Sequence, residues 1–180
     1  LASDMVWNNV NWDPSPGITN PFKGSEAYYS VDDKPIGLNI STSKLVIGLE
    51  QQNVVLPDFL TSDFGLAGRA QVYQSSQAIT PALLASIQSI PGVTFTTPVF
   101  VGVEGGTEAA VLDEVIIKLK SGVSAQDYFS SLPEVASYRP VQGTTDQYVG
   151  RFATAFGRKT LEKANALDLG ASVDWVAPNF

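Results

Sequence analysis

The clearest hydrophobic pattern begins at Glu114, where the sequence reads EVIIKLK. Alternation with a period of two predicts a strand that buries one face. That face takes every second residue from Val115, while the opposite face becomes basic at Lys118 and Lys120. Lys118 and Lys120 are therefore candidate partner contacts on the open face, and the simpler alternative is a solvated strand surface.

The residues that follow predict two helices and three more strands. Ser124 to Asp127 form a capping box, and the helix that they start ends before Pro133. Strands are expected at 135–141, which an internal proline confines to a sheet edge or a bulge, and at 147–153. A helix over 158–169 and a strand over 173–177 complete the order β-α-β-β-α-β. This order is the ferredoxin-like arrangement, with two helices on one face of the sheet.

The first half repeats this order in a shortened form. Strands are expected at 28–30, 36–40, 44–50, 69–73 and 93–100, and a helix starts at Pro81 with Thr80 as its N-cap. The segment 58–62 is compatible with a short helix. Both halves close on one pattern, VTFTTPVF from Val93 and VDWVAPNF from Val173, which are 80 residues apart (173 − 93).

We therefore expect an α+β protein built from tandem ferredoxin-like (βαββαβ) units with antiparallel sheets. Residues 1–35 form an N-terminal arm and hairpin, 36–104 the first, shortened unit, and 111–180 the second unit. The irregular arm, 1–27, carries Trp7, Trp12 and Phe22 among prolines and glycines. These aromatic residues pack on their own domain or dock on a neighbouring chain.

Composition narrows the function. The 180 residues are 44% hydrophobic and 16% charged, which is typical of a chain that forms a core. The net charge is −7 and the basic residues form no run, so a nucleic-acid partner is not expected. No apolar run reaches the ~18 residues of a membrane span. Asn39 opens a glycosylation sequon, which matters only in a eukaryotic secretory setting.

Candidate chemistry is sparse. The chain contains neither histidine nor cysteine, which removes the Ser-His-Asp triad, thiol nucleophiles and most transition-metal sites. Carboxylate pairs and Ser-Lys arrangements survive, but none has a local signature. We therefore predict a protein that is not an enzyme and has no cofactor or metal.

The second unit resembles a known family through the segments EVIIKLKSGVSAQDYF, YVGRF, LEKANAL and VDWVAPNF. Together they are similar to the N-terminal prodomain of secreted subtilisin-like serine proteases. The closing motif of those prodomains is matched at Val173, Trp175, Val176, Pro178 and Asn179, while Ala177 replaces the usual glutamate.

The resemblance implies a secreted propeptide that acts as an intramolecular chaperone and inhibitor of a cognate protease encoded downstream. It implies that the open sheet face, including Trp175, packs on the protease. It also implies that Ala177, Pro178, Asn179 and Phe180 approach the protease cleft. The simpler alternatives are that Trp175 packs in the core and that Phe180 is a terminal strand residue.

A second hypothesis is a secreted structural subunit of a filament or surface layer, built from prodomain-like modules. Edge strands are ready templates for another chain, and the arm 1–27 can pack on a neighbour. This hypothesis predicts self-association rather than a protease partner.

Overall fold

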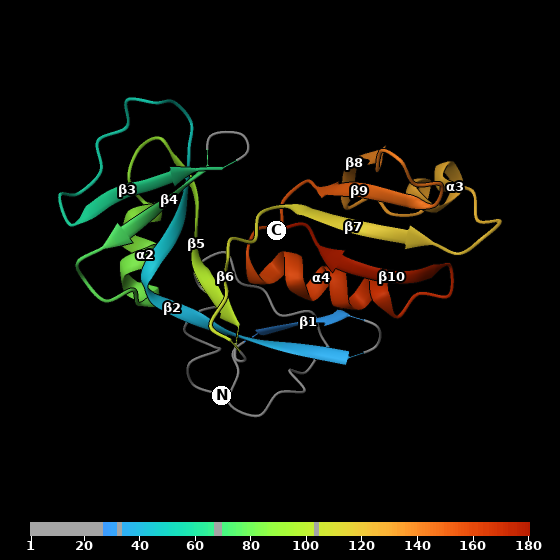
Figure 1. Ribbon diagram of the computed structural model, residues 1–180. Coiled ribbons are helices and arrows are strands. Elements are labelled where there is room, and N and C mark those ends of the chain that lie inside the picture. Colours follow the sequence, from blue (N-terminus) through green and yellow to red (C-terminus); the bar gives the residue numbers. More distant parts are fainter. Residues whose placement is uncertain (1–26, 32–33, 67–69, 103–104) are drawn as a thin grey trace.

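The computed structural model describes residues 27–31, 34–66, 70–102 and 105–180, and it confirms an α+β protein with antiparallel sheets (Figure 1). The predicted arm contacts Trp7, Trp12 and Phe22 lie outside these residues. The first half contains β1 (Ala27–Val31), β2 (Lys34–Leu49), β3 (Leu60–Gly65), β4 (Ala70–Ser75), α2 (Pro81–Gln88), β5 (Val93–Gly102) and β6 (Glu108–Ala109). The second half contains β7 (Glu114–Leu119), α3 (Ala125–Ser130), β8 (Val135–Pro140), β9 (Gln147–Phe152), α4 (Arg158–Asp168) and β10 (Val173–Pro178).

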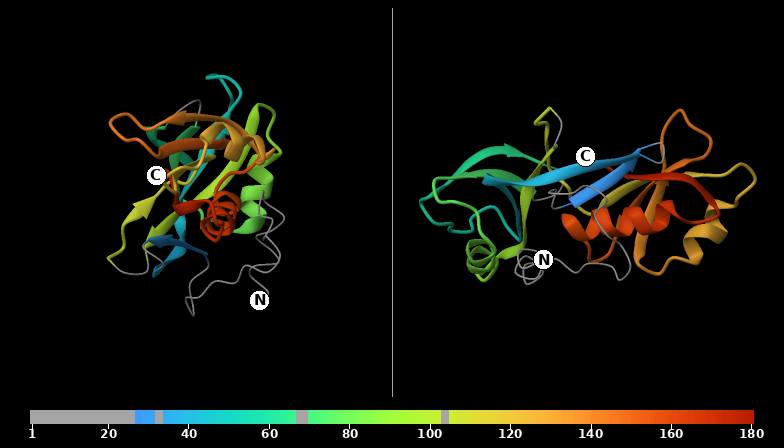
Figure 2. Two further views of the ribbon diagram at one scale, coloured as in Figure 1. Left: turned by 90° about the vertical axis from the view of Figure 1, so that its right-hand side faces the viewer. Right: turned by 90° about the horizontal axis from the view of Figure 1, so that it is seen from below.

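The second half follows the predicted order of strands and helices. Its sheet has the order β10-β7-β9-β8, and every neighbouring pair is antiparallel. Phe129 of α3 and Ala164 of α4 join one core with Val115, Ile117 and Leu119, so both helices cover the same face (Figure 2). The Ser124 hydroxyl caps α3 by accepting a 3.3 Å hydrogen bond from the Asp127 amide. Of the helices in the described part of the chain, none lies on the opposite face of this sheet, which is called the helix-free face below.

The first sheet has the order β3-β4-β2-β5-β6, with β1 paired to β2. Its strands β3, β4, β2 and β5 correspond in order to β8, β9, β7 and β10 of the second sheet. One helix, α2, is present among the described residues of this half. The Thr80 hydroxyl caps α2 through the Leu83 amide at 3.1 Å.

Two local predictions for the first half are wrong. Residues 36–40 and 44–50 belong to one strand, β2, whose register against β5 shifts between Ile40 and Leu45. The Ser41 hydroxyl accepts hydrogen bonds from the amides of Ser43 (3.2 Å) and Lys44 (3.0 Å), so the shift is closed locally and the strand continues. The segment 58–62 forms no helix, because from Leu60 its backbone pairs with β4.

The two halves pack directly on each other. Phe156, in the loop after β9, stacks on Phe95 of β5 with ring centroids 4.0 Å apart. The connecting segment is held by the second half: the Gly157 amide donates to the Val111 carbonyl (3.1 Å) and the Phe152 amide donates to the Asp113 carbonyl (2.8 Å). Residue Leu161 of α4 joins the core beneath α2. The halves therefore form one packed body rather than two units on a linker.

We predict that Gly157→Ala lowers the free energy of unfolding by about 3 kcal/mol or more. Gly157 has φ 61° and ψ −128°, and an added Cβ would lie 2.9 Å from the Thr97 Cβ and overlap the Thr97 hydroxyl. Gly143 is the matched control, because its φ is also positive (81°) and the space around it is open. Gly143→Ala should cost only about 1–2 kcal/mol. Equal losses in urea unfolding would show that the contact with Thr97 is unimportant.

Candidate functional site

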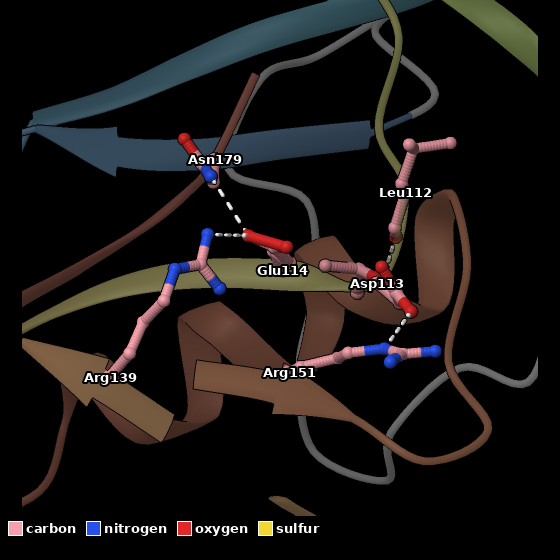
Figure 3. Close-up of polar contacts among 7 residues, drawn as sticks. Leu112, Asp113, Glu114, Arg139, Arg151 and Asn179 are labelled. Carbon is pink, nitrogen blue, oxygen red and sulfur yellow. Dashed lines mark hydrogen bonds and ion pairs between the residues drawn. The ribbon is translucent and has the colours of Figure 1, made fainter. Parts of the chain in front are cut away.

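Three of the four predicted tail residues, Ala177 to Asn179, are paired with strand β7, whose first residue is Glu114. Ala177 and Pro178 pair with Ile116 and Val115 as the last residues of β10, and Pro178 is buried. Asn179 continues this pairing, because its amide donates to the Glu114 carbonyl at 3.0 Å. Its side-chain amide also donates to the Glu114 carboxylate at 3.1 Å (Figure 3).

Phe180 is the one exposed residue of the predicted tail. Its side chain is 57% exposed and meets the ring of Tyr29 edge-on, with centroids 5.1 Å apart. Tyr29 belongs to β1, which lies beside α4 and β10 (Figure 2). The β1–β2 hairpin therefore contacts the end of the second half.

Two ion pairs surround the end of the chain (Figure 3). Arg139 of β8 donates to the Glu114 carboxylate at 3.0 Å, and Arg151 of β9 donates to the Asp113 carboxylate at 2.9 Å. Because β9 lies between β8 and β7, the side chain of Arg139 crosses β9 to reach Glu114. The two guanidinium side chains are 60% and 61% exposed, whereas the carboxylate side chains are 23% and 15% exposed. The positive groups therefore face outward.

These residues line a cleft of about 810 Å³ between the two sheets. The first half contributes Phe64, Leu66, Phe95 and the small residues Gly48, Ala70 and Thr94. The first half also contributes Leu49 of β2 and Glu108 and Ala109 of β6. The connecting segment and the second half contribute Ala110, Leu112, Asp113, Glu114, Ser137, Arg139, Arg151, Phe156, Asn179 and Phe180. One wall is aromatic and the other is polar.

The third acidic residue of the cleft, Glu108, is also paired. The Lys44 ammonium lies 2.9 Å from the Glu108 carboxylate and 3.7 Å from that of Asp63. The hydrogen bond to Glu108 and its charge raise the pKa of Lys44 above its ordinary value. Each carboxylate that lines the cleft thus has a cation beside it.

The structure brings two of the three predicted sheet-face residues together. Trp175, half-buried on the edge strand β10, is the register partner of Lys118 on β7. Lys118 lies 3.8 Å from Asp174, and both side chains are more than one third exposed. Lys120 is exposed just beyond the end of β7. The register also places Ile116 and Val149 on this helix-free face.

The sequence did not point to Arg139, Arg151, Asp113 or Glu114. Arginines at alternate strand positions are ordinary for a solvated face, and their partners are 25 and 38 residues away. Among the described residues there is no group of three or more acidic side chains placed to hold a metal ion. No helix of the described part is long and apolar enough to span a bilayer.

Comparison with family models, with curated proteins and with solved structures found no match to this chain.

We predict that Glu114→Ala destabilises the protein by about 1–2 kcal/mol, because it removes the bonds to Arg139 and to the Asn179 side chain. The control, Asp174→Ala, removes the longer and more exposed pair with Lys118 and should cost less than about 0.5 kcal/mol. Urea unfolding of both variants is the measurement. A loss for Glu114→Ala no greater than that for Asp174→Ala would mean that Glu114 does not hold the end of the chain.

Proposed function

We propose that this chain is the non-catalytic prodomain of a secreted subtilisin-like protease and acts as its intramolecular chaperone and inhibitor. We propose further that residues 111–180 are a ferredoxin-like unit and that 36–104 are a shortened copy of it. The order β-α-β-β-α-β, the strand order β10-β7-β9-β8 and the shared core of α3 and α4 support this assignment.

The observation that carries the proposal is the helix-free face of the second sheet. Its centre is apolar, with the half-buried Ile116 and Trp175 beside the buried Val149, and charged side chains border it. A sheet buries one face in its own core, and an apolar centre on the other face favours a partner surface. On this proposal, Trp175 is the main aromatic anchor, as large aromatic side chains commonly are at interfaces.

The end of the chain has a smaller part in the proposal. Ala177 and Pro178 complete β10, and Asn179 is bonded to Glu114, so three of the four tail residues are held by the fold. Contact with the protease cleft therefore falls to Phe180 and whatever follows it. Docking through the sheet face brings this end toward the partner.

Self-assembly through strand edges receives less support. Two of the outer strands carry register shifts, β3 between Ser62 and Phe64 and β8 between Val135 and Ser137. Strand β8 also ends at Pro140, which lacks the donor that a neighbouring strand would need. Bulges and prolines at edges are features that hinder edge-to-edge pairing.

We predict that the purified chain inhibits its cognate subtilisin-like protease and that Trp175→Ala weakens inhibition by about 10- to 100-fold, the range of an interface anchor. Val55→Ala is the control, since Val55 is 85% exposed in the first half, away from the second sheet. The measurement is the inhibition constant against a chromogenic peptide substrate.

Two results would contradict the proposal. One is the absence of inhibition at micromolar concentration together with no acceleration of protease refolding. The other is a Trp175→Ala variant that unfolds like the unmodified chain and inhibits equally well, which would remove the sheet face from the interface.

A further inference from the structure

The cleft between the two sheets has a composition that the proposed inhibitor role does not require. We propose that it binds an extended peptide segment in which a carboxylate side chain neighbours an apolar one. The carboxylate lies on Arg139 and Arg151, and the apolar side chain lies against Phe64 and Phe156. Arg139 and Arg151 lie at one end of the helix-free face, whereas the protease contact proposed above is centred on Trp175, and peptide binding does not depend on a protease partner.

The aromatic wall provides the apolar contact. Phe64 lines the cleft at the end of β3 and is 52% exposed, an unusual exposure for a large aromatic side chain. Leu66 is half-buried beside it in the sequence, and Phe156 is half-buried and fixed by its stacking on Phe95. The wall is thus partly preformed, which reduces the entropy lost on binding.

The polar wall provides the charge. A guanidinium has five N–H donors, and the ion pairs use Nη2 of Arg139 and Nε of Arg151. In the contacts that the structure gives them, most donors of both groups remain available. On β8, Ser137 is the register partner of Arg151, and Arg139 lies two residues further along the same strand. Arg139 and Arg151 are therefore diagonal neighbours on one face of the sheet. Diagonal neighbours lie about 7–8 Å apart, so two long side chains at such positions can both reach one bound carboxylate.

The acidic side chains of the cleft do not cancel this preference. Asp113 and Glu114 lie beneath the guanidinium groups and are less exposed than their partners. Glu108 is more exposed, but its carboxylate is bonded to Lys44. An incoming carboxylate therefore meets the outward arginines before it meets an uncompensated negative charge.

The borders of the cleft suit an extended backbone. Strands β3 and β8 are the outer strands of their sheets, and both contribute lining residues, Phe64 from one and Ser137 and Arg139 from the other. Because the bulges in these two strands hinder pairing with a further strand, an extended peptide is held here by side chains from both borders. The volume of about 810 Å³ accommodates a few residues of such a segment.

The test uses the full chain labelled with ¹⁵N and three capped hexapeptides. The first contains one glutamate beside one phenylalanine among glycine and serine. In the second, glutamine replaces the glutamate, and in the third, alanine replaces the phenylalanine. We expect the first to shift the side-chain Nε–H signals of Arg139 and Arg151 with a dissociation constant below about 5 mM, and the other two to bind at least about fivefold more weakly.

Variants of the chain locate the site. Arg139→Gln, Arg151→Gln and Phe64→Ser should each weaken binding of the first peptide at least about fivefold. Lys118→Gln, on the same sheet face but outside the cleft lining, should leave it unchanged. Because Phe64 is half-exposed, its variant tests the site even if an arginine variant fails to fold.

Three outcomes would overturn the inference: no signal shift at about 5 mM peptide, equal binding of the glutamate and glutamine peptides, or equal weakening by Lys118→Gln. Since no protease is present, failure here is distinct from failure of the inhibition test.

Discussion

The packing of the loop that carries Phe156 and Gly157 on the first sheet determines how the rest of the structure is arranged. Phe156 stacks on Phe95, and Gly157 lies where any side chain would overlap Thr97. The same loop binds the connecting segment through the bond from Gly157 to Val111. These contacts fix the second sheet against the first. Without them, the shared core around Leu161 and the cleft would not form.

This fixed arrangement explains why the polar residues of the site converge. Strand β7 follows directly from the bound segment, so Asp113 and Glu114 emerge at the junction of the two halves. There they meet arginines from β8 and β9 and the end of β10. One end of the helix-free face consequently forms the polar wall of the cleft. A partner that docks on the face would also lie near the cleft.

The sequence predicted the elements of the second half well, because its signals are local. The alternation after Glu114 and the Ser124 cap identify a strand and a helix without further context. The first half was harder. The strands predicted at 36–40 and 44–50 form one strand, because the Ser41 hydroxyl binds the backbone at the register shift between them. The segment expected to be helical forms part of β3, because its backbone pairs with β4. In both cases tertiary pairing decided the outcome.

The site was predicted only in part for a related reason. The sequence pointed to Trp175 and Lys118 because they lie on a recognisable strand pattern and end motif, and their role as partner contacts stays a prediction. The ion pairs of Arg139 and Arg151 join residues that are 25 and 38 positions apart in the sequence, so no local spacing pattern predicts them. The cleft depends on how two sheets pack, which periodicity within either half does not reveal.

On the proposed function, the helix-free face of the second sheet is the surface that meets the partner. Methyl cross-saturation from an inactivated cognate protease to the deuterated, methyl-labelled chain tests it most directly. Saturation is expected at the methyl groups of Ile116, which is half-buried on this face, and not at those of Ile117, which points to the helices on the opposite face. Saturation confined to β3 and the first half, with none at Ile116, would contradict it.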